Sequence, residues 1–171
     1  MNIRRATLKD AATLSKLACT TFYDTFTGTC TEQDMEAFLD EYYSLNQTLI
    51  ELKNPDDFFY LYEIDNRAVG YIKFAEDNSG FEELKNFKSL ELKRLYVLKE
   101  YHGKGIAQNL MKLLFGFAIE NNCNVVWLGV WEHNYKAQTF YKKYGFSDTG
   151  YAHPFPIGNT PQTDLWYWKQ L

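Results

Sequence analysis

The sequence predicts an α/β (α+β) fold in which helices flank a central sheet of about seven strands. Short runs rich in β-branched and aromatic residues are interspersed with longer stretches whose apolar residues recur at helical spacing. Residues 125–130 are almost entirely apolar, as a strand buried on both faces requires. No repeat, low-complexity segment or shift in composition divides the 171 residues. We therefore expect a single domain over residues 1–171.

The first third of the chain predicts one short strand and three helices. Asn2–Arg5 forms the strand, and Thr7-Leu8-Lys9-Asp10 resembles a capping box that opens a helix through about residue 23. Thr31-Glu32-Gln33-Asp34 repeats this start signal for a second helix. A short third helix is expected over residues 45–52, and Pro55 ends it.

The remaining two thirds predict most of the sheet. Residues 58–64 and 69–75 flank Asp65-Asn66-Arg67, which indicates a hairpin, and a polar loop starts at residues 77–80. Ser89–Val97 is the next strand. A helix over 104–121, a strand over 125–130, a helix over 134–144 and strands over 147–151 and 163–169 follow, with a loop over 154–161. Asn134 is the expected N-cap of the last helix, and Gly145 is expected at its C-cap.

Composition and charge argue against several classes of function. A formal net charge of -4 argues against a general nucleic-acid binder. No apolar run approaches the length of a membrane helix, and residues 1–5 lack the apolar stretch of a signal peptide, so we expect a cytoplasmic protein with no membrane partner. Cys19, Cys30 and Cys123 match neither a disulfide framework nor a zinc pattern, so we expect free thiols and no metal.

The most informative stretch is the strand 92–97 followed by His102-Gly103-Lys104-Gly105-Ile106-Ala107. It reads as a strand, a glycine-containing turn and a helix start, where backbone N–H groups and the helix dipole favour a bound anion. This arrangement suits a pyrophosphate. The spacing Gly-x-Gly-x-x-Gly is missing, and Ile106 stands where a P-loop has Ser or Thr, so dehydrogenases and P-loop enzymes fit poorly.

Two motifs in this order resemble the GNAT acyltransferases. Their cofactor loop reads Arg/Gln-x-x-Gly-x-Gly/Ala, and residues 102–107 fit it except that His102 replaces Arg or Gln. The second motif comprises Asn134, Ala137, Phe140-Tyr141, Lys143 and Gly145-Phe146. The resemblance implies a GNAT fold with a mixed, mostly antiparallel central sheet.

The same resemblance implies acetyl-CoA as cofactor and acetyl donor. In such proteins the backbone of the strand pairs with the pantetheine arm, the glycine loop holds the pyrophosphate, and an Asn hydrogen-bonds the pantetheine. The implied cofactor-binding residues are, in this order, Leu95, Tyr96 and Val97; His102, Gly103, Lys104, Gly105, Ile106 and Ala107; and Asn134. Lys143 or Lys104 could also meet phosphate charge, although both could equally be ordinary surface residues.

Two residues are candidates for catalysis, one from the resemblance and one from its place on the expected strand over residues 89–97. Tyr141 matches the position whose hydroxyl protonates the leaving thiolate, although its helical spacing with Ala137 and Tyr144 is equally that of a core residue. Glu91, a few residues before the predicted cofactor contacts, is the best candidate for the base that takes the proton of the attacking amine, directly or through a water, although it could equally be a solvent-facing strand residue. His153 is a rival, and a reaction without a dedicated base is a third alternative.

Over nearly its full length the chain is similar to the PaiA-type spermidine/spermine N-acetyltransferases. The similarity rests on residues 21–26, 127–132 and 162–165, and the chain departs from it at Lys93, where an acidic residue is expected. The resemblance implies a polyamine acceptor that attacks directly in a ternary complex. Carboxylates and aromatic rings near the first two helices suit a cation, although they also suit a solvated face over an apolar core: Phe22, Tyr23, Asp24, Phe26, Glu32, Asp34 and Glu36.

Other functions stay open at this stage. The chain could act on a protein N-terminus, a lysine side chain, an amino acid or a drug amine. It could instead be a non-catalytic acyl-CoA sensor, although such a sensor needs neither Tyr141 nor Glu91. Trp166-Tyr167-Trp168 could serve a homodimer interface or lie inside the sheet as a strand with alternate residues buried.

Overall fold

The computed structural model describes residues 2–76 and 80–171, so most of the predicted polar loop at 77–80 lies outside the described residues. Every helix and strand that the sequence predicts is present, with ends that differ by a few residues. The elements are β1 (Asn2–Arg5), α1 (Ala11–Phe26), α2 (Glu32–Tyr43), α3 (Leu45–Lys53), β2 (Asp57–Ile64), β3 (Arg67–Glu76), β4 (Ser89–Val97), α4 (Ile106–Glu120), β5 (Val125–Trp131), α5 (Tyr135–Lys143), β6 (Ser147–Pro154) and β7 (Thr163–Gln170). Short 3-10 helices at Leu8–Asp10, Glu82–Asn86 and Lys99–Tyr101 were not predicted.

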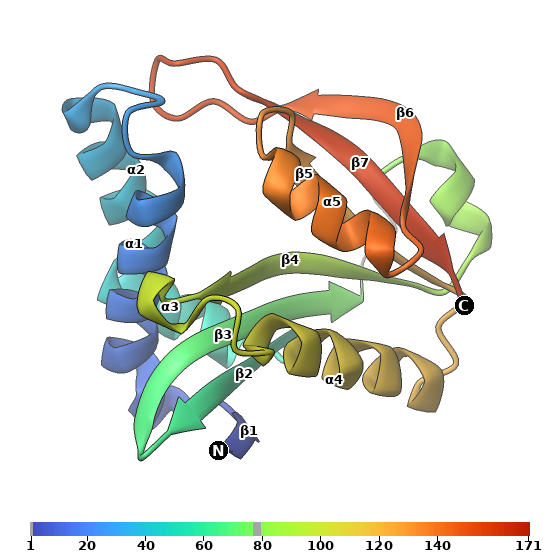
Figure 1. The fold of residues 1–171 in the computed structure, drawn as a ribbon, viewed down its shortest axis with the longest axis horizontal. Coiled ribbons are helices and arrows are strands. Elements are labelled where there is room, and N and C mark those ends of the chain that lie inside the picture. The colour runs from blue at the N-terminus through green and yellow to red at the C-terminus, as the bar shows by residue number, and fades with distance from the viewer. Residues whose placement is uncertain (1, 77–79) are drawn as a thin grey trace.

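The strands form one seven-stranded sheet in the order β1-β2-β3-β4-β5-β7-β6 (Figure 1). Neighbouring strands are antiparallel except β4 and β5, which confirms the mixed, mostly antiparallel sheet. A parallel pair needs a crossover, and α4 supplies it. The β4–β5 pairing covers only Ser89–Glu91 opposite residues 125–127, and the two strands then diverge. The sheet is therefore split along its middle.

The helices cover the sheet on either side of this split. α1 and α4 both pack against β3 and β4, whereas α5 lies beside the half that contains β5 and β7 (Figure 1). The largest fully buried side chains are Leu14, Phe22, Met35, Leu61, Tyr71, Ile72, Phe74, Leu84, Leu90, Leu110, Met111 and Tyr167. Because these residues come from both halves of the sheet and from the helices, the core holds the two halves in place around the split.

The helix start signals act as the sequence predicts. The Thr7 backbone N–H donates to Asp10 Oδ2 at 2.8 Å, although the first turn is a 3-10 helix and α1 begins only at Ala11. Thr31 Oγ1 accepts from the Asp34 N–H at 3.1 Å. Asn134 Oδ1 accepts from the Ala137 N–H at 3.1 Å, which caps α5.

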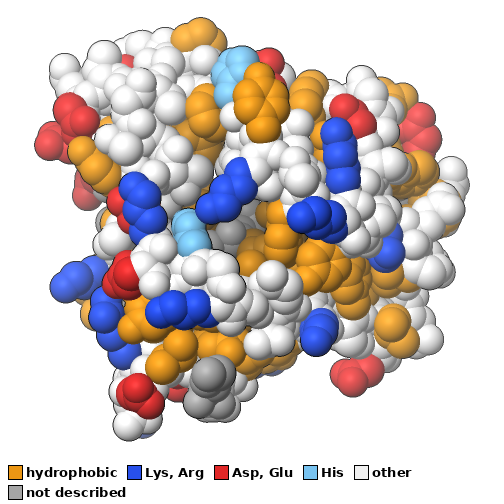
Figure 2. All heavy atoms as spheres, viewed as in Figure 1, with side chains coloured by type: hydrophobic (Ala, Val, Ile, Leu, Met, Phe, Trp, Pro, Cys, Tyr) orange, Lys and Arg blue, Asp and Glu red, His pale blue; other side chains and the backbone are white. Residues whose placement is uncertain are grey.

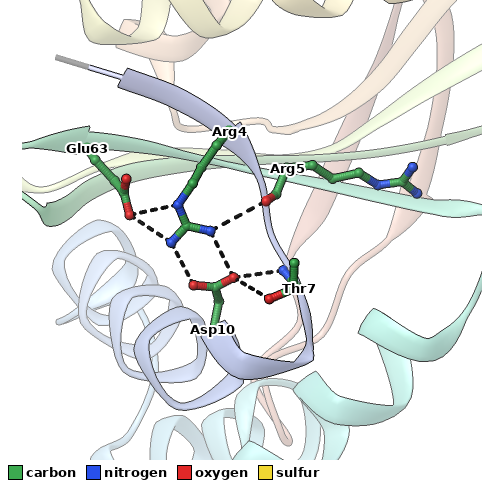
Figure 3. Close-up of polar contacts among 5 residues, drawn as sticks. All are labelled: Arg4, Arg5, Thr7, Asp10 and Glu63. Atoms are coloured by element: carbon green, nitrogen blue, oxygen red, sulfur yellow. Dashed lines mark hydrogen bonds and ion pairs between the residues drawn. The ribbon is translucent and has the colours of Figure 1, made fainter.

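Arg4 ties the start of α1 to the edge of the sheet (Figure 3). Its guanidinium donates to both carboxylate oxygens of Asp10, at 2.9 and 2.7 Å, and to Glu63 Oε1 at 3.1 and 2.8 Å. The hydrogen bond to Arg4 holds the pKa of Asp10 well below its usual range. β1, the turn before α1 and β2 are thus joined through one side chain.

The aromatic segment near the C-terminus is an internal strand. β7 lies between β5 and β6, and Tyr167 is 1% exposed. Trp166 and Trp168 pack around Phe81, with ring centroids 5.7 Å from that ring in both cases. These residues therefore build the core on this side of the sheet. No helix within residues 2–76 and 80–171 combines the length and apolar character needed to cross a membrane.

Candidate active site

Two clefts open where β4 and β5 diverge. The larger cleft has a volume of about 770 Å³ and the smaller cleft about 510 Å³. Figure 2 shows hydrophobic side chains gathered across the middle of this face, with Lys and Arg side chains around them. The two clefts share five lining residues: Leu95, Tyr96, Asn134, Ala137 and Tyr141. A molecule in one cleft would meet a molecule in the other beside these residues.

The smaller cleft contains a cradle of backbone N–H groups. Gly103 and Gly105 each have φ of +78°, a left-handed conformation that glycine adopts without steric cost. No side chain caps the start of α4. Within the described part of the chain, no acceptor takes a hydrogen bond from the N–H groups of residues 103–108. This arrangement fits a pyrophosphate, because successive N–H groups and the helix dipole favour an anion.

The open edge of β4 provides further backbone groups. Along residues 90–97 the strand pairs with β3 on one side, but β5 covers its other side only at Ser89–Glu91. The register between β3 and β4 shifts at Lys93, the extra residue of a β-bulge, and a bulge bends its strand. The edge beyond the bulge can therefore pair with an extended ligand that carries amide groups.

His102 links the glycine loop to α5. Its Nε2 lies 2.8 Å from the carbonyl oxygen of Val97, and because a carbonyl only accepts, Nε2 is the protonated nitrogen. The bare Nδ1 then accepts from Lys136 Nζ at 3.2 Å. Both residues line the smaller cleft, so a lysine that the sequence did not suggest is held beside the predicted phosphate site.

Most predicted cofactor residues line the smaller cleft. They are Leu95, Tyr96, Val97, His102, Gly103, Gly105, Ile106, Ala107 and Asn134. Lys104 instead places Nζ over the Tyr101 ring, 4.5 Å from its centroid, and is exposed. Lys143 is exposed at the end of α5 and lines neither cleft.

Tyr141 lies where the two clefts meet. Its ring packs against Phe140 and Phe146, at centroid distances of 5.5 and 5.8 Å. Burial, and next the charge of Asp164, raise the pKa of its phenol, so the hydroxyl keeps its proton at neutral pH. Asn134, which also borders both clefts, uses its amide oxygen to cap α5 and keeps its amide N–H groups for a ligand.

Two carboxylates of the larger cleft differ in their surroundings. Glu91 Oε2 accepts from Lys93 Nζ at 2.6 Å, and the residue lies about 13 Å along β4 from Leu95, at 3.3 Å per residue. Asp164 is at the start of β7, and burial raises the pKa of its carboxyl to about 7. No catalytic role was predicted for Asp164 from the sequence, although Asp164 lies in the segment 162–165 that contributes to the family resemblance.

His153, the predicted rival base, lines neither cleft. Its Nδ1 accepts a hydrogen bond from the Trp166 indole N–H, and burial lowers the pKa of the imidazole. The lone pair that would accept a proton from an amine is thus already used inside the sheet.

A buried ion cluster forms part of the larger cleft. Lys73 Nζ lies 2.9 Å from Glu51 Oε1 and 3.1 Å from Asp57 Oδ2, and Arg94 donates to both Glu51 oxygens at 2.7 and 3.0 Å. The Arg94 guanidinium also lies over the Tyr43 ring, 4.5 Å from its centroid. The cluster joins α3 to β2, β3 and β4.

The acidic and aromatic residues predicted near the first two helices are only partly brought to the clefts. Phe22 and Phe26 line the larger cleft and Asp24 the smaller one. Glu32 meets the Tyr23 hydroxyl at 3.3 Å on the surface, and Asp34 accepts from the Asn159 backbone N–H at 3.1 Å. Asp34 therefore has a structural role.

The loop between β6 and β7 reaches across to the α1–α2 connection (Figure 1). Besides the Asp34–Asn159 contact, Gln162 Nε2 donates to the Thr29 carbonyl oxygen at 3.3 Å. Phe155 from this loop packs against Phe26 and Phe38, with ring centroids 6.3 and 5.7 Å away. Because Phe155 and both of these rings line the larger cleft, the loop bounds it at this end.

Comparisons with known proteins agree with this geometry. Residues 18–146 match the family model described as "Acetyltransferase (GNAT) family". An "Uncharacterized N-acetyltransferase in pepI 3'region" from Lactobacillus delbrueckii subsp. lactis is 32% identical over 95% of this chain and 93% of its own. A "Probable spermine N(1)-acetyltransferase" from Bacillus subtilis subsp. natto is 26% identical over 70% of this chain and 86% of its own. The structure of the PaiA N-acetyltransferase from Thermoplasma acidophilum in complex with coenzyme A superposes with a TM-score of 0.79 at 24% identity, covering 99% of this chain and 98% of that one.

Proposed function

The chain belongs to the acetyltransferase (GNAT) family, and we propose that it transfers acetyl from acetyl-CoA to a primary amine of a polyamine such as spermidine or spermine. The acetyl donor and the N-acetyltransferase activity follow from the family. The polyamine, and direct attack by its amine in a ternary complex, are the proposal. The main observation in support of this proposal is that the two clefts meet at Tyr141 and Tyr96, so that a donor in one and an acceptor in the other would lie side by side.

The smaller cleft is the proposed site of acetyl-CoA, which when bound supplies an acetyl thioester. The N–H groups of residues 103–108 would hold its pyrophosphate, and the open edge of β4 at Leu95, Tyr96 and Val97 would pair with its pantetheine arm. The Asn134 amide would donate to the same arm. Lys136 adds positive charge at the phosphate end, whereas roles for Lys104 and Lys143 stay predictions from the sequence.

Tyr141 is the proposed proton donor to the leaving thiolate. Its raised pKa keeps a proton on the phenol. Among the described residues, no hydrogen bond to another side chain or backbone group occupies the Tyr141 hydroxyl. Glu91, the base predicted from the sequence, borders the larger cleft and is paired with Lys93. Glu91 lies four residues before Leu95 on β4, and in this role its carboxylate would take the proton of the amine through a water.

The charge of the larger cleft favours a cationic acceptor. The charges of Glu51 and Asp57 are balanced by those of Lys73 and Arg94 within the buried ion cluster. The other charged residues that line this cleft are Asp56, Glu76, Glu91 and Asp164 against Lys93. Aromatic rings from Phe22, Phe26, Phe38, Tyr42 and Trp131 line the same cleft and offer faces to an ammonium group.

A small amine fits this cleft better than a peptide. The β6–β7 loop bounds the cleft at one end, which limits the room for the residues that would flank the amine of a peptide. The Bacillus relative named as a probable spermine acetyltransferase supports the same substrate class. An amino acid or a drug amine is the second candidate, since either could also occupy a cleft of about 770 Å³.

Thiol release from acetyl-CoA tests the proposed function. We expect rapid release with spermidine and spermine and only background release with an N-terminal peptide of equal amine concentration. Release with the peptide and not with either polyamine would discard the polyamine acceptor and keep the acetyltransferase. Binding of acetyl-CoA without release for any amine would contradict the proposed transfer and favour a sensor.

Lys136→Met is expected to raise the Kd for acetyl-CoA about 10-fold, because one charge-assisted contact to phosphate is lost. Isothermal titration calorimetry with acetyl-CoA measures the change. Lys142→Met, on the same helix but outside both clefts, is the matched control, and we expect a change in Kd below about 2-fold. A larger rise in Kd for Lys142→Met than for Lys136→Met would contradict the phosphate contact of Lys136.

A further inference from the structure

We propose that the Asp164 carboxylate accepts the proton that the acceptor amine must lose before it attacks the thioester. This inference rests on the proposed function, and it assigns the proton acceptor to a residue on β7 in place of Glu91 on β4. It follows from the position of Asp164, the space around its carboxylate and the lack of a partner for it.

Asp164 lies in the wall of the larger cleft near the junction. Its cross-strand neighbours are Trp131 on β5 and His153 on β6. After burial, the charge of Asp164 is the second cause of the raised pKa of the Tyr141 phenol. The predicted proton donor on α5 and the proposed proton acceptor on β7 both line the larger cleft.

Gly129 leaves room for this carboxylate. A Cβ atom built on Gly129 would lie 3.0 Å from Asp164 Oδ2 and 3.5 Å from His153 Cε1. The first of these distances is tighter than ordinary contact, so a side chain at position 129 would push the carboxylate aside. A glycine within the otherwise apolar β5 thus has a specific packing reason.

The carboxylate is half-buried in the cleft wall and has no partner among the described residues. No donor in the described part of the chain gives it a hydrogen bond or an ion pair, whereas the Glu91 carboxylate is held by Lys93. The titratable groups that face Asp164 are Tyr141 from α5 and His153 from β6, and β5 contributes Gly129 and Trp131. The Trp131 indole N–H is also buried without a partner and lines the same cleft, so it offers a donor beside this acceptor.

Burial, with no opposing cation, raises the pKa of Asp164 to about 7. A general base works best when its pKa is near the operating pH, because it is then both deprotonated and basic enough to hold a proton. The Glu91 carboxylate is instead occupied by its ion pair with Lys93.

The amine nitrogen loses two protons in the reaction, one to Asp164 and one to Tyr141. Asp164 takes one proton from the ammonium nitrogen, whose freed electron pair forms the C–N bond to the thioester carbonyl carbon. As the C–S bond breaks with its electron pair on sulfur, Tyr141 gives its proton to that sulfur. The second proton of the nitrogen returns to the Tyr141 oxygen, and Asp164 releases its proton to solvent.

The test compares Asp164→Asn with the matched variant Glu91→Gln, using spermidine as acceptor. For the wild-type enzyme we expect kcat/KM to rise with pH and to bend near pH 7. Asp164→Asn should lower kcat/KM about 100-fold at pH 8 and remove this bend, whereas Glu91→Gln should keep it. A bend that disappears in Glu91→Gln and persists in Asp164→Asn would overturn the proposal.

Four further readouts separate a proton acceptor from a residue that only shapes the cleft. The Kd for acetyl-CoA and the melting temperature of Asp164→Asn should match those of the wild type closely. A ¹³C-NMR titration of the free protein should show one aspartate carboxyl that titrates near pH 7, and the variant should lack it. With trifluoroethylamine, whose nitrogen is mostly unprotonated at pH 8, Asp164→Asn should lose less than about 5-fold in rate.

The measurements distinguish a wrong role for Asp164 from a wrong proposed function. An equal loss with spermidine and trifluoroethylamine would mean that Asp164 only shapes the cleft. An unchanged pH profile in Asp164→Asn would also overturn its role while leaving the acetyltransferase intact. Absence of thiol release from the wild-type protein with every amine would contradict the proposed function, and with it the role of Asp164.

Discussion

Tyr141→Phe is expected to lower kcat for thiol release about 100- to 10,000-fold while leaving the Kd for acetyl-CoA within about 2-fold of the wild type. The substitution removes one hydroxyl from a ring that packs against Phe140 and Phe146, so the shape of the cleft junction is kept. A loss confined to kcat is the pattern of an interaction made only in the transition state. Steady-state kinetics at saturating acceptor and calorimetry with acetyl-CoA give the two quantities.

Tyr144→Phe is the matched control for this experiment. Tyr144 lies at the end of the same helix, packs against Phe115 and Phe140, and lines neither cleft. We expect its kcat to stay within about 2-fold of the wild type. Equal turnover in Tyr141→Phe and the wild type would remove Tyr141 from the chemistry and leave it as a packing residue.

Glu51→Gln is expected to lower the free energy of unfolding by about 3 to 5 kcal/mol. The change leaves Lys73 and Arg94, whose side chains are 5% and 15% exposed, with two positive charges against the single carboxylate of Asp57. Such a loss is large beside the 5 to 15 kcal/mol that stabilises a typical domain. Urea unfolding of both proteins, followed by tryptophan fluorescence, measures the difference.

The exposed ion pair between Arg67 and Glu100 supplies the control. Its two side chains are 61% and 56% exposed, and we expect Glu100→Gln to change the free energy of unfolding by less than about 1 kcal/mol. Equal effects of the two substitutions would show that the buried ion cluster contributes no more than a surface pair.

The buried ion cluster should also make the protein less stable at acid pH, because of the lowered pKa of Glu51. Burial alone would raise the pKa of Glu51, but the charges of Arg94 and Lys73 outweigh it and hold the pKa below the usual 4.5. The folded state therefore binds fewer protons at this site than the unfolded state. The stabilisation from Glu51 is present above pH 4.5 and is lost as the pH falls through the lowered pKa, and Glu51→Gln should remove this part of the acid dependence.

The local signals of the chain were enough to predict its secondary structure. Asn2–Arg5 and Ser89–Val97 begin and end where expected. The helix over α1 extends to Phe26 beyond the expected end, since no glycine or proline stops it at residue 23. The mixed, mostly antiparallel character of the sheet came from the family resemblance. The strand order and the split between β4 and β5 were not predicted, because they depend on pairing between distant segments.

The candidate site was predictable only where a motif is local. The loop around Gly103 and Gly105 has the left-handed backbone that its glycines suggested. Asp164 could not be placed, because its position beside Gly129 and Tyr141 depends on the register of β7 against β5 and on the packing of α5. Lys136 likewise depends on a contact with a histidine 34 residues earlier in the chain.

The position of the open edge of β4 also protects the protein against aggregation. A strand edge with unpaired N–H and C=O groups is normally a template on which another protein molecule can add a strand and start aggregation. Here the open groups of residues 92–97 lie in the interior of the sheet order, flanked by β3 on one side and by β5 and α5 across the split. A second chain cannot lie flat against them, whereas a thin, flexible ligand can enter. The molecule thus keeps a free hydrogen-bonding edge for its ligand and hides it from other proteins.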